Sequence, residues 1–274
     1  MTAPRVIGLI AGGRSFPLLA AEGVKRAGHR LVVAAFPGHS NMDVKRHADV
    51  FGKLRLGKLD DLIAFFKDNG VTEVIMAGTI SKSRAMLDVM RFDARARRVI
   101  FSVMDKGDAN LLKVIAAEFD AEGMTVIPAH TFQPDLLTPA GVLTATQPDE
   151  AQWEDLRRGF ALCRELGRMD IGQCLVLKQG VVAAVEALEG TDDAVARGCR
   201  LGGPGCVVVK AFKPGQEERT DLPSAGARTI RAMARGKAAC LGLEAGKSLL
   251  FEREEAIRRA DAAGIAIVGL TEDI

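Results

Sequence analysis

The sequence lacks the features that mark several large classes of protein. Its five cysteines show no C-x-x-C spacing, and its four histidines are scattered. Zinc sites and disulfide frameworks depend on such spacing, so we expect reduced, partly buried thiols and histidines that are structural or on the surface. No apolar run approaches the roughly 18 residues of a membrane-spanning helix, and the amino terminus lacks the apolar stretch of a signal peptide. These absences predict a cytoplasmic protein.

An excess of charge of one sign is also missing. Lysine and arginine together number 37 and aspartate and glutamate 35, so the formal net charge is +2. Nucleic-acid-binding domains usually carry a strongly basic surface, and we therefore expect no nucleic-acid partner. Hydrophobic residues form 48% of the 274 residues, which is ample for a globular interior. A chain of this length is expected to form two domains of about 100–150 residues each.

The first half of the chain alternates short apolar runs with helical patterns. The run Val6–Ala11 is followed by Gly12 and Gly13 and then by a helical pattern over 18–26. A strand, a glycine turn and a helix open a doubly wound α/β domain. The glycines let the backbone come close to a ligand at the start of the helix, where free N–H groups favour anions. A tight structural turn is the alternative for these glycines. We expect further strands at 31–36, 50–56, 71–76 and 124–127, and helices at 58–69, 91–104 and 108–119.

Polar residues follow two of these apolar runs. Arg14 comes directly after the glycine turn, while Thr79 and Lys82 follow the strand expected at 71–76. If the sheet is parallel, both loops lie at its carboxyl edge, where α/β sheets bind ligands. Ordinary surface charge is the alternative for Lys82.

The prolines Pro134 and Pro139 mark a join between two domains. We predict a Rossmann-like N-terminal domain over 1–133, a linker over 134–149 and a C-terminal α/β domain over 150–274. Trp153 is expected to pack rather than to bind a ligand. In the second domain we expect helices at 150–166, 191–201, 228–237 and 254–263, and strands at 174–178, 181–188, 206–212, 238–244, 248–252 and 265–270.

Charge is clustered after two apolar strands of the second half. The first cluster follows the strand over 181–188, and the second follows the strand that runs through Lys210. Lysine and arginine suit a phosphate and carboxylates suit a divalent cation, so the pattern predicts a phosphate ligand with a metal. A solvated loop between core strands is the alternative, and for Asp192 a role as a helix N-cap. The residues concerned are Glu186, Glu189, Gly190, Thr191, Asp192, Asp193, Lys210, Lys213, Arg219 and Asp221.

Several motifs along the chain resemble one known family. They include G-L-I-A-G-G-x-x-x-P-L from Gly8, D-I-G-Q from Asp170, A-V-E-A-L-E-G-T-D from Ala184 and K-x-x-K-P-G-Q-x-x-R-x-D-L-P from Lys210. The sequence resembles the UDP-2,3-diacylglucosamine pyrophosphatases of lipid A biosynthesis, of the two-domain type unrelated to the calcineurin-like phosphoesterases. The likeness covers nearly the whole chain.

The resemblance implies hydrolysis of the pyrophosphate of UDP-2,3-diacylglucosamine, which gives UMP and 2,3-diacylglucosamine 1-phosphate (lipid X). It implies a divalent metal, usually Mg²⁺, and water attack on the phosphorus of the sugar side. It also implies a Rossmann-like domain and a second α/β domain, with the substrate in a cleft between them. We further expect transient contact with the inner-membrane surface and consider a homodimer.

Roles for individual residues follow from the same resemblance. Asp221 is expected to be a metal ligand or the general base, because it is the acid in the most distinctive loop, with Lys213 and Glu186 as further catalytic residues. Metal ligands are expected among Asp221, Glu186 and Asp192. Substrate contacts are expected from Gly12, Gly13, Arg14, Thr79, Lys82, Gln173, Glu189, Gly190, Thr191, Lys210 and Arg219. The alternatives are another nucleotide-sugar enzyme, such as a transferase, and a non-catalytic lipid or nucleotide-sugar binding protein.

Overall fold

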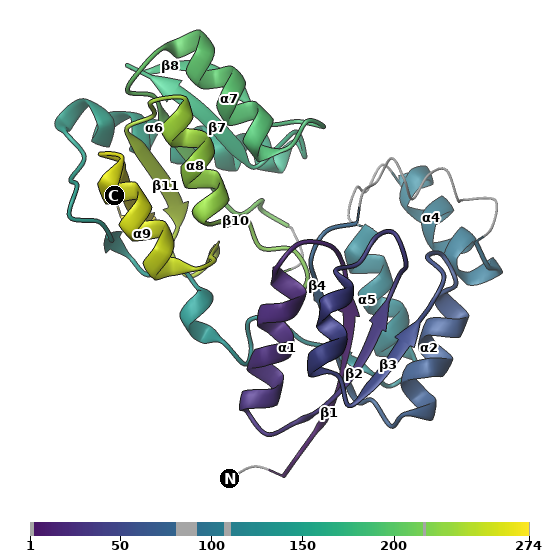
Figure 1. Ribbon diagram of the computed structural model, residues 1–274. Helices are drawn as coiled ribbons and strands as arrows, with labels where there is room; N and C mark the ends of the chain where they lie inside the picture. The colour runs from purple at the N-terminus through teal and green to yellow at the C-terminus, as the bar shows by residue number, and fades with distance from the viewer. Residues whose placement is uncertain (1–2, 81–91, 107–110, 216–217, 274) are drawn as a thin grey trace. The chain divides into compact units, whose positions relative to one another are not determined.

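The computed structural model describes residues 3–80, 92–106, 111–215 and 218–273, and the chain forms two compact units (Figure 1). The first unit comprises Met1–Pro134 together with Glu217–Asp221, and the second comprises Asp135–Gln216 with Leu222–Ile274. Lys82 lies outside the described residues. Within 134–149, the range predicted as a linker, the short strand β6 (Gly141–Val142) pairs with a strand of the second unit.

The first unit is built on a parallel sheet. Its strands are β1 (Val6–Ala11), β2 (Arg30–Ala35), β3 (Val50–Lys53), β4 (Glu73–Ala77) and β5 (Thr125–Val126), in the order β3-β2-β1-β4-β5. Strands buried on both faces need continuous apolar runs, and β2 is buried at every residue after Arg30. This strand order confirms the Rossmann-like prediction, and its switch point lies between β1 and β4.

Helices cover both faces of this sheet. Helix α1 (Phe16–Arg26) and the 3₁₀ helix η1 (Met42–His47) pack on one face, over a core that includes Leu9 and Val24. Helices α2 (Leu59–Asp68), α4 (Ala94–Lys106) and α5 (Leu111–Ala121) pack on the other face, over a core that includes Phe66 and Phe119.

The second unit is a mixed sheet between helices. Its strand order is β6-β13-β11-β9-β7-β8. Strands β9 (Val207–Lys210), β11 (Cys240–Glu244) and β13 (Ala266–Leu270) are parallel, and β7 (Cys174–Lys178) runs antiparallel to both β9 and β8 (Val181–Val185). The prediction of a second α/β domain is therefore confirmed. The short strands β10 (Ser224–Ala225) and β12 (Leu249–Leu250) pair separately.

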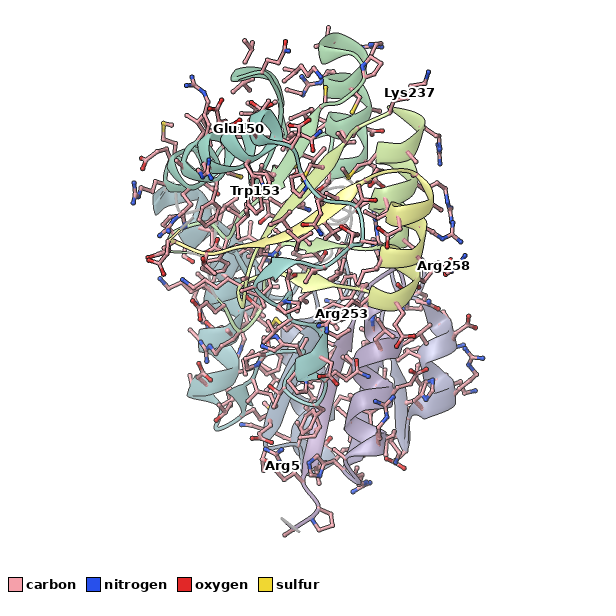
Figure 2. The ribbon with its side chains drawn as sticks, turned by 90° about the vertical axis from the view of Figure 1, so that its left-hand side faces the viewer. Arg5, Glu150, Trp153, Lys237, Arg253 and Arg258 are labelled. Carbon is pink, nitrogen blue, oxygen red and sulfur yellow. The ribbon has the colours of Figure 1, made fainter. Side chains whose placement is uncertain are left out.

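Helix α6 (Glu150–Arg168) packs on one face of the second sheet, with Leu156 and the partly buried Trp153 in its core (Figure 2). Helices α7 (Thr191–Gly202), α8 (Ala227–Arg235) and α9 (Arg253–Ala262) contribute to the core on the other face. Helix α6 begins where Asp149 and Gln152 form a capping box. The expected packing role of Trp153 is confirmed.

All five cysteines are free and buried in the second unit. Burial raises the pKa of Cys163 and Cys240 to about 12 and that of Cys199 to about 11. It also raises the pKa of Cys174 and Cys206 above the usual range. The prediction of reduced thiols is confirmed, and because the thiolate is the reactive form, burial makes them unreactive.

The glycine turn after β1 joins the two strands at the switch point. The Gly12 N–H donates to the Ala77 carbonyl at 2.7 Å and the Gly13 N–H to the Thr79 carbonyl at 2.8 Å. Both N–H groups are therefore used by the last residue of β4 and by the loop that follows it. The anion site expected at the start of the following helix stays a prediction. A Cβ on Gly12 would lie 2.7 Å from the carbonyl carbon of Gly78. Glycine at position 12 allows the turn after β1 and the backbone at Gly78 to approach this closely.

We predict that Gly12→Ala lowers the stability of the first unit. The added Cβ meets backbone atoms that cannot rotate away, and such overpacking costs about 1–3 kcal/mol. A thermal melt followed by circular dichroism should show a midpoint several degrees lower. The matched control is Ser15→Ala, since Ser15 is exposed in the same turn and makes no capping hydrogen bond from its side chain. Equal midpoints for the two variants would contradict the steric account.

Candidate active site

A row of polar side chains crosses one edge of the second sheet. Lys210, at the end of β9, pairs in register with Cys174 of β7, and the Cys174 carbonyl accepts the Glu186 N–H at 2.9 Å. Adjacent strands therefore bring Lys210 and Glu186 to one edge. Val208 and Ala184 belong to the core beneath α7, and alternation along each strand places Lys210 and Glu186 on this same face.

Thr191, the first residue of α7, joins these two charged side chains. Lys210 Nζ donates to Thr191 Oγ1 at 2.8 Å, and Thr191 Oγ1 donates to Glu186 Oε1 at 2.9 Å. Lys210 Nζ also donates to the Ser224 carbonyl at 2.9 Å, and Lys210 is only 3% exposed. A buried ammonium group is tolerated only with such partners. We call Lys210, Thr191 and Glu186 the polar row.

Two buried oxygens at this edge lack a hydrogen-bond partner among the described residues. They are Glu186 Oε2 and Gln173 Oε1, and Gln173 directly precedes β7. Buried acceptors without a donor are rare in folded proteins. Both oxygens can therefore serve a donor group or a cation of a bound ligand.

The loops around the polar row are fixed by ion pairs. Lys213 Nζ lies 2.8 Å from Asp170 Oδ1, and Arg197 pairs with Glu189. The hydrogen bond from Arg197 holds the pKa of the Glu189 carboxyl below its usual range, so this group is ionised at neutral pH. Gly190 has a φ of 85° at the N-cap of α7, a conformation that favours glycine.

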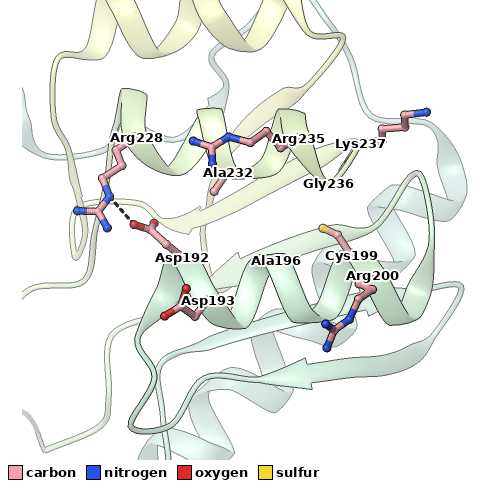
Figure 3. A pocket seen from close by; sticks show the side chains of 10 residues that line it. All are labelled: Asp192, Asp193, Ala196, Cys199, Arg200, Arg228, Ala232, Arg235, Gly236 and Lys237. Atoms are coloured by element: carbon pink, nitrogen blue, oxygen red, sulfur yellow. Dashed lines mark ion pairs between the residues drawn. The ribbon is translucent and has the colours of Figure 1, made fainter.

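A groove of about 540 Å³ lies between α7 and α8 (Figure 3). Asp192 lies at one end of it, where its Oδ2 is 2.5 Å from Arg228 Nε. The N-cap role considered for Asp192 is wrong, because Gly190 occupies the cap and Asp192 lies in the first turn. An acid in the first turn is favoured by the helix dipole.

Models of two domains match consecutive parts of the chain. The LpxI N-terminal domain matches residues 6–136, and the LpxI C-terminal domain matches residues 139–268. The chain belongs to the LpxI family. The UDP-2,3-diacylglucosamine pyrophosphatase LpxI of Caulobacter vibrioides is 34% identical over 283 residues, which covers 97% of this chain and 98% of that protein. The resemblance drawn from the sequence motifs is therefore confirmed.

A solved structure shows a weaker likeness outside the LpxI family. The biotin carboxylase domain of the Hydrogenobacter thermophilus 2-oxoglutarate carboxylase is 10% identical, over 72% of this chain and 42% of that one, with a TM-score of 0.28. A TM-score this low supports no inference about fold or activity.

The structure brings together some of the predicted site residues of this LpxI chain. Glu186, Thr191 and Lys210 form the polar row, and Gln173 lies at the same edge. Glu189, Lys213 and Asp192 surround this group and are engaged with Arg197, Asp170 and Arg228.

The remaining predicted residues belong to the first unit. Arg14 and Thr79 are exposed at the switch point, where Gly12 and Gly13 form the turn. Arg219 Nη1 lies 3.0 Å from Asp120 Oδ2, and Asp221 is exposed. These two residues group with the first unit although they follow the second sheet's β9 in the sequence.

No group of three or more histidine, cysteine, aspartate or glutamate side chains could hold a metal in the part of the chain that the structure describes. Mg²⁺ does not need such a group, because it usually binds one or two carboxylates together with water and substrate phosphates. Glu186 Oε2, which has no hydrogen-bond partner in the described parts of the chain, fits this mode of binding.

Glu244 is a buried charged residue that the sequence reasoning missed. It ends β11, is 5% exposed, and its Oε2 accepts the Phe212 N–H at 2.8 Å. Burial raises the pKa of its carboxyl above the usual range. The sequence did contain a signal for Glu244, since this charged residue ends an apolar strand just as Lys210 ends β9. Glu244 fixes the backbone that leads from β9 to Lys213.

We predict that Thr191→Val destabilises the second unit. The change leaves buried Lys210 without one acceptor and Glu186 Oε1 without its donor, at a cost of about 1–3 kcal/mol. Urea unfolding followed by fluorescence reports on this unit, since Trp153 is the sole tryptophan. Thr191→Ser is the matched control because it keeps the hydroxyl. A similar loss in both variants would show that the hydroxyl is not responsible.

Proposed function

We propose that this chain hydrolyses the pyrophosphate of UDP-2,3-diacylglucosamine to UMP and 2,3-diacylglucosamine 1-phosphate, in lipid A biosynthesis, with a divalent cation such as Mg²⁺. Membership of the LpxI family identifies the chain as a UDP-2,3-diacylglucosamine pyrophosphatase, and the products and the cation are part of the proposal. The observation from the chain itself that carries the proposal is the polar row. In it, a buried lysine lies beside a carboxylate with one oxygen that has no hydrogen-bond partner among the described residues.

The polar row suits a ligand that is both anionic and metal-bound. The described partners of Lys210 Nζ take two of the three N–H donors of an ammonium group, and the third can reach a phosphate oxygen. Thr191 holds the ammonium and the Glu186 carboxylate in fixed positions. Preorganised charge of this kind stabilises the negative charge that develops when a phosphoanhydride breaks.

The reaction that we propose is attack of water on the sugar-side phosphorus. The new bond joins the water oxygen to this phosphorus, the bridging P–O bond breaks, and UMP leaves with the bridging oxygen. The water proton passes to a carboxylate, for which Asp221 is our candidate, and Lys210, Lys213 and Arg219 are candidates for phosphate contacts. When bound, a divalent cation polarises the phosphoryl oxygens, and Glu186, Asp192 and Asp221 are its candidate ligands.

We propose that the enzyme also meets its lipid substrate at a membrane surface. Among the described helices, none is both long and apolar enough to cross a bilayer. A diacylated substrate is itself held in the membrane, so transient surface contact is sufficient.

The direct test is incubation of the purified chain with UDP-2,3-diacylglucosamine and Mg²⁺. We expect release of UMP without any acceptor, measured by chromatography, and loss of turnover when EDTA removes the cation. A transferase would need an acceptor before UMP appears. A carrier would bind the lipid and release no UMP, and this result would refute the proposed activity.

We predict that Asp221→Ala lowers kcat by at least about 100-fold, the usual contribution of a general base, while substrate still binds. The measurements are initial rates and calorimetric titration with the substrate. Glu218→Ala is the matched control, because Glu218 is an exposed acid of the same segment. Near-normal turnover of the Asp221 variant would reject the assignment.

A further inference from the structure

Three exposed apolar side chains lie on two loops of the second unit. Leu188 is 99% exposed, Met169 62% and Ile171 47%. Met169 and Ile171 lie between α6 and β7, and Leu188 lies between β8 and α7. We call these three residues the apolar rim. Single exposed apolar residues are common on soluble proteins, so it is the placement of the three that matters.

The two loops touch beside the polar row. A Cβ on Gly172 would lie 2.0 Å from the Glu186 carbonyl oxygen, so the backbones of the loops are in direct contact there. Ile171 directly precedes Gly172, and Leu188 lies between Glu186 and Thr191 in the sequence. The apolar rim therefore borders the residues that we propose to bind phosphate.

The exposure of the rim is not the result of loose loops. The Ile171 N–H donates to the Leu166 carbonyl at 3.0 Å, and Asp170 adopts a φ of 55°, a left-handed conformation that aspartate tolerates. On the second loop, Glu189 Oε2 accepts the Ala187 N–H at 3.1 Å. These hydrogen bonds fix the backbone while the apolar side chains point to solvent.

The charges nearest to the rim are paired within the protein. Asp170, between Met169 and Ile171, pairs with Lys213, and Glu189, next to Leu188, pairs with Arg197. These neighbouring carboxylates are therefore compensated. The rim itself is therefore apolar surface, and the polar row lies beside it.

We propose that the apolar rim contacts the acyl chains of a diacylated sugar phosphate whose phosphate lies at the polar row, an inference that rests on the proposed function. In such a ligand the phosphate and both acyl groups are attached to one sugar ring. The acyl chains therefore leave within a few bonds of the phosphorus, and apolar side chains beside the phosphate-binding residues meet them first. Burial of the rim by an acyl chain removes apolar surface from water.

The test compares two substrates in the same detergent. One is UDP-2,3-diacylglucosamine with long acyl chains, and the other is the same UDP-sugar with two acetyl groups. We expect Leu188→Ser and Ile171→Ser each to lower the ratio of kcat/KM for the long-chain substrate to that for the acetyl substrate by about 10-fold. Turnover of the acetyl substrate should stay near that of the unmodified chain, because the polar row is untouched.

The matched control is Leu201→Ser. Leu201 is 65% exposed and lies near the other end of α7, about 15 Å along the helix from Thr191. This control should leave the ratio unchanged. An unchanged ratio in the rim variants, with both substrates turned over, would overturn the proposal. So would a loss of binding to phospholipid vesicles in the rim variants with no change in the ratio, since the rim would then contact a bilayer.

A second measurement separates this inference from the proposed activity. Calorimetric titration with 2,3-diacylglucosamine 1-phosphate needs no turnover, and Leu188→Ser should weaken binding about 10-fold while Leu201→Ser does not. If the unmodified chain binds this lipid in a rim-dependent way but releases no UMP from the substrate, the activity is wrong and the acyl contact stands. Equal binding by both variants would refute the acyl contact alone.

Discussion

The buried ammonium group of Lys210 is the constraint on which the charged edge of the second unit depends. A lysine with 3% exposure needs partners for its donors, and here a threonine hydroxyl and a backbone carbonyl accept from two of the three. The hydroxyl belongs to the first residue of α7, so the start of this helix is tied to the end of β9. The same hydroxyl donates to Glu186 and fixes the end of β8 as well.

The sequence was sufficient for most of the fold because buried strands require continuous apolar runs. The bounds expected for Val6–Ala11 and Cys174–Lys178 agree with those of β1 and β7, since glycine or polar residues end both runs abruptly. The strand expected over 50–56 ends at Lys53 instead. Leu54 donates one more backbone hydrogen bond to Ala35 of β2, and Leu54 and Leu56 pack against the core of the first unit beyond the end of the strand. An apolar pattern alone does not reveal where the strand ends.

The candidate site was harder to predict from the sequence than the fold. Glu186, Thr191 and Lys210 were singled out by type and position, but the bridge between them depends on the register of β7, β8 and β9. The same limit applies to Gly12 and Gly13, whose N–H groups donate to the end of β4 and to the loop after it, more than sixty residues later in the chain. Glu244 was missed because its carboxylate accepts a hydrogen bond from the backbone of Phe212, just beyond the end of β9, and the sequence does not show that these two segments are neighbours.

The distribution of the cysteines has a practical consequence for studies of this molecule in solution. Every thiol is buried in the second unit, and burial raises the pKa of each one. A cysteine introduced on the surface of the first unit would therefore react with a maleimide dye far faster than the native thiols. The wild-type chain can thus serve as its own nearly silent background for site-directed fluorescent labelling.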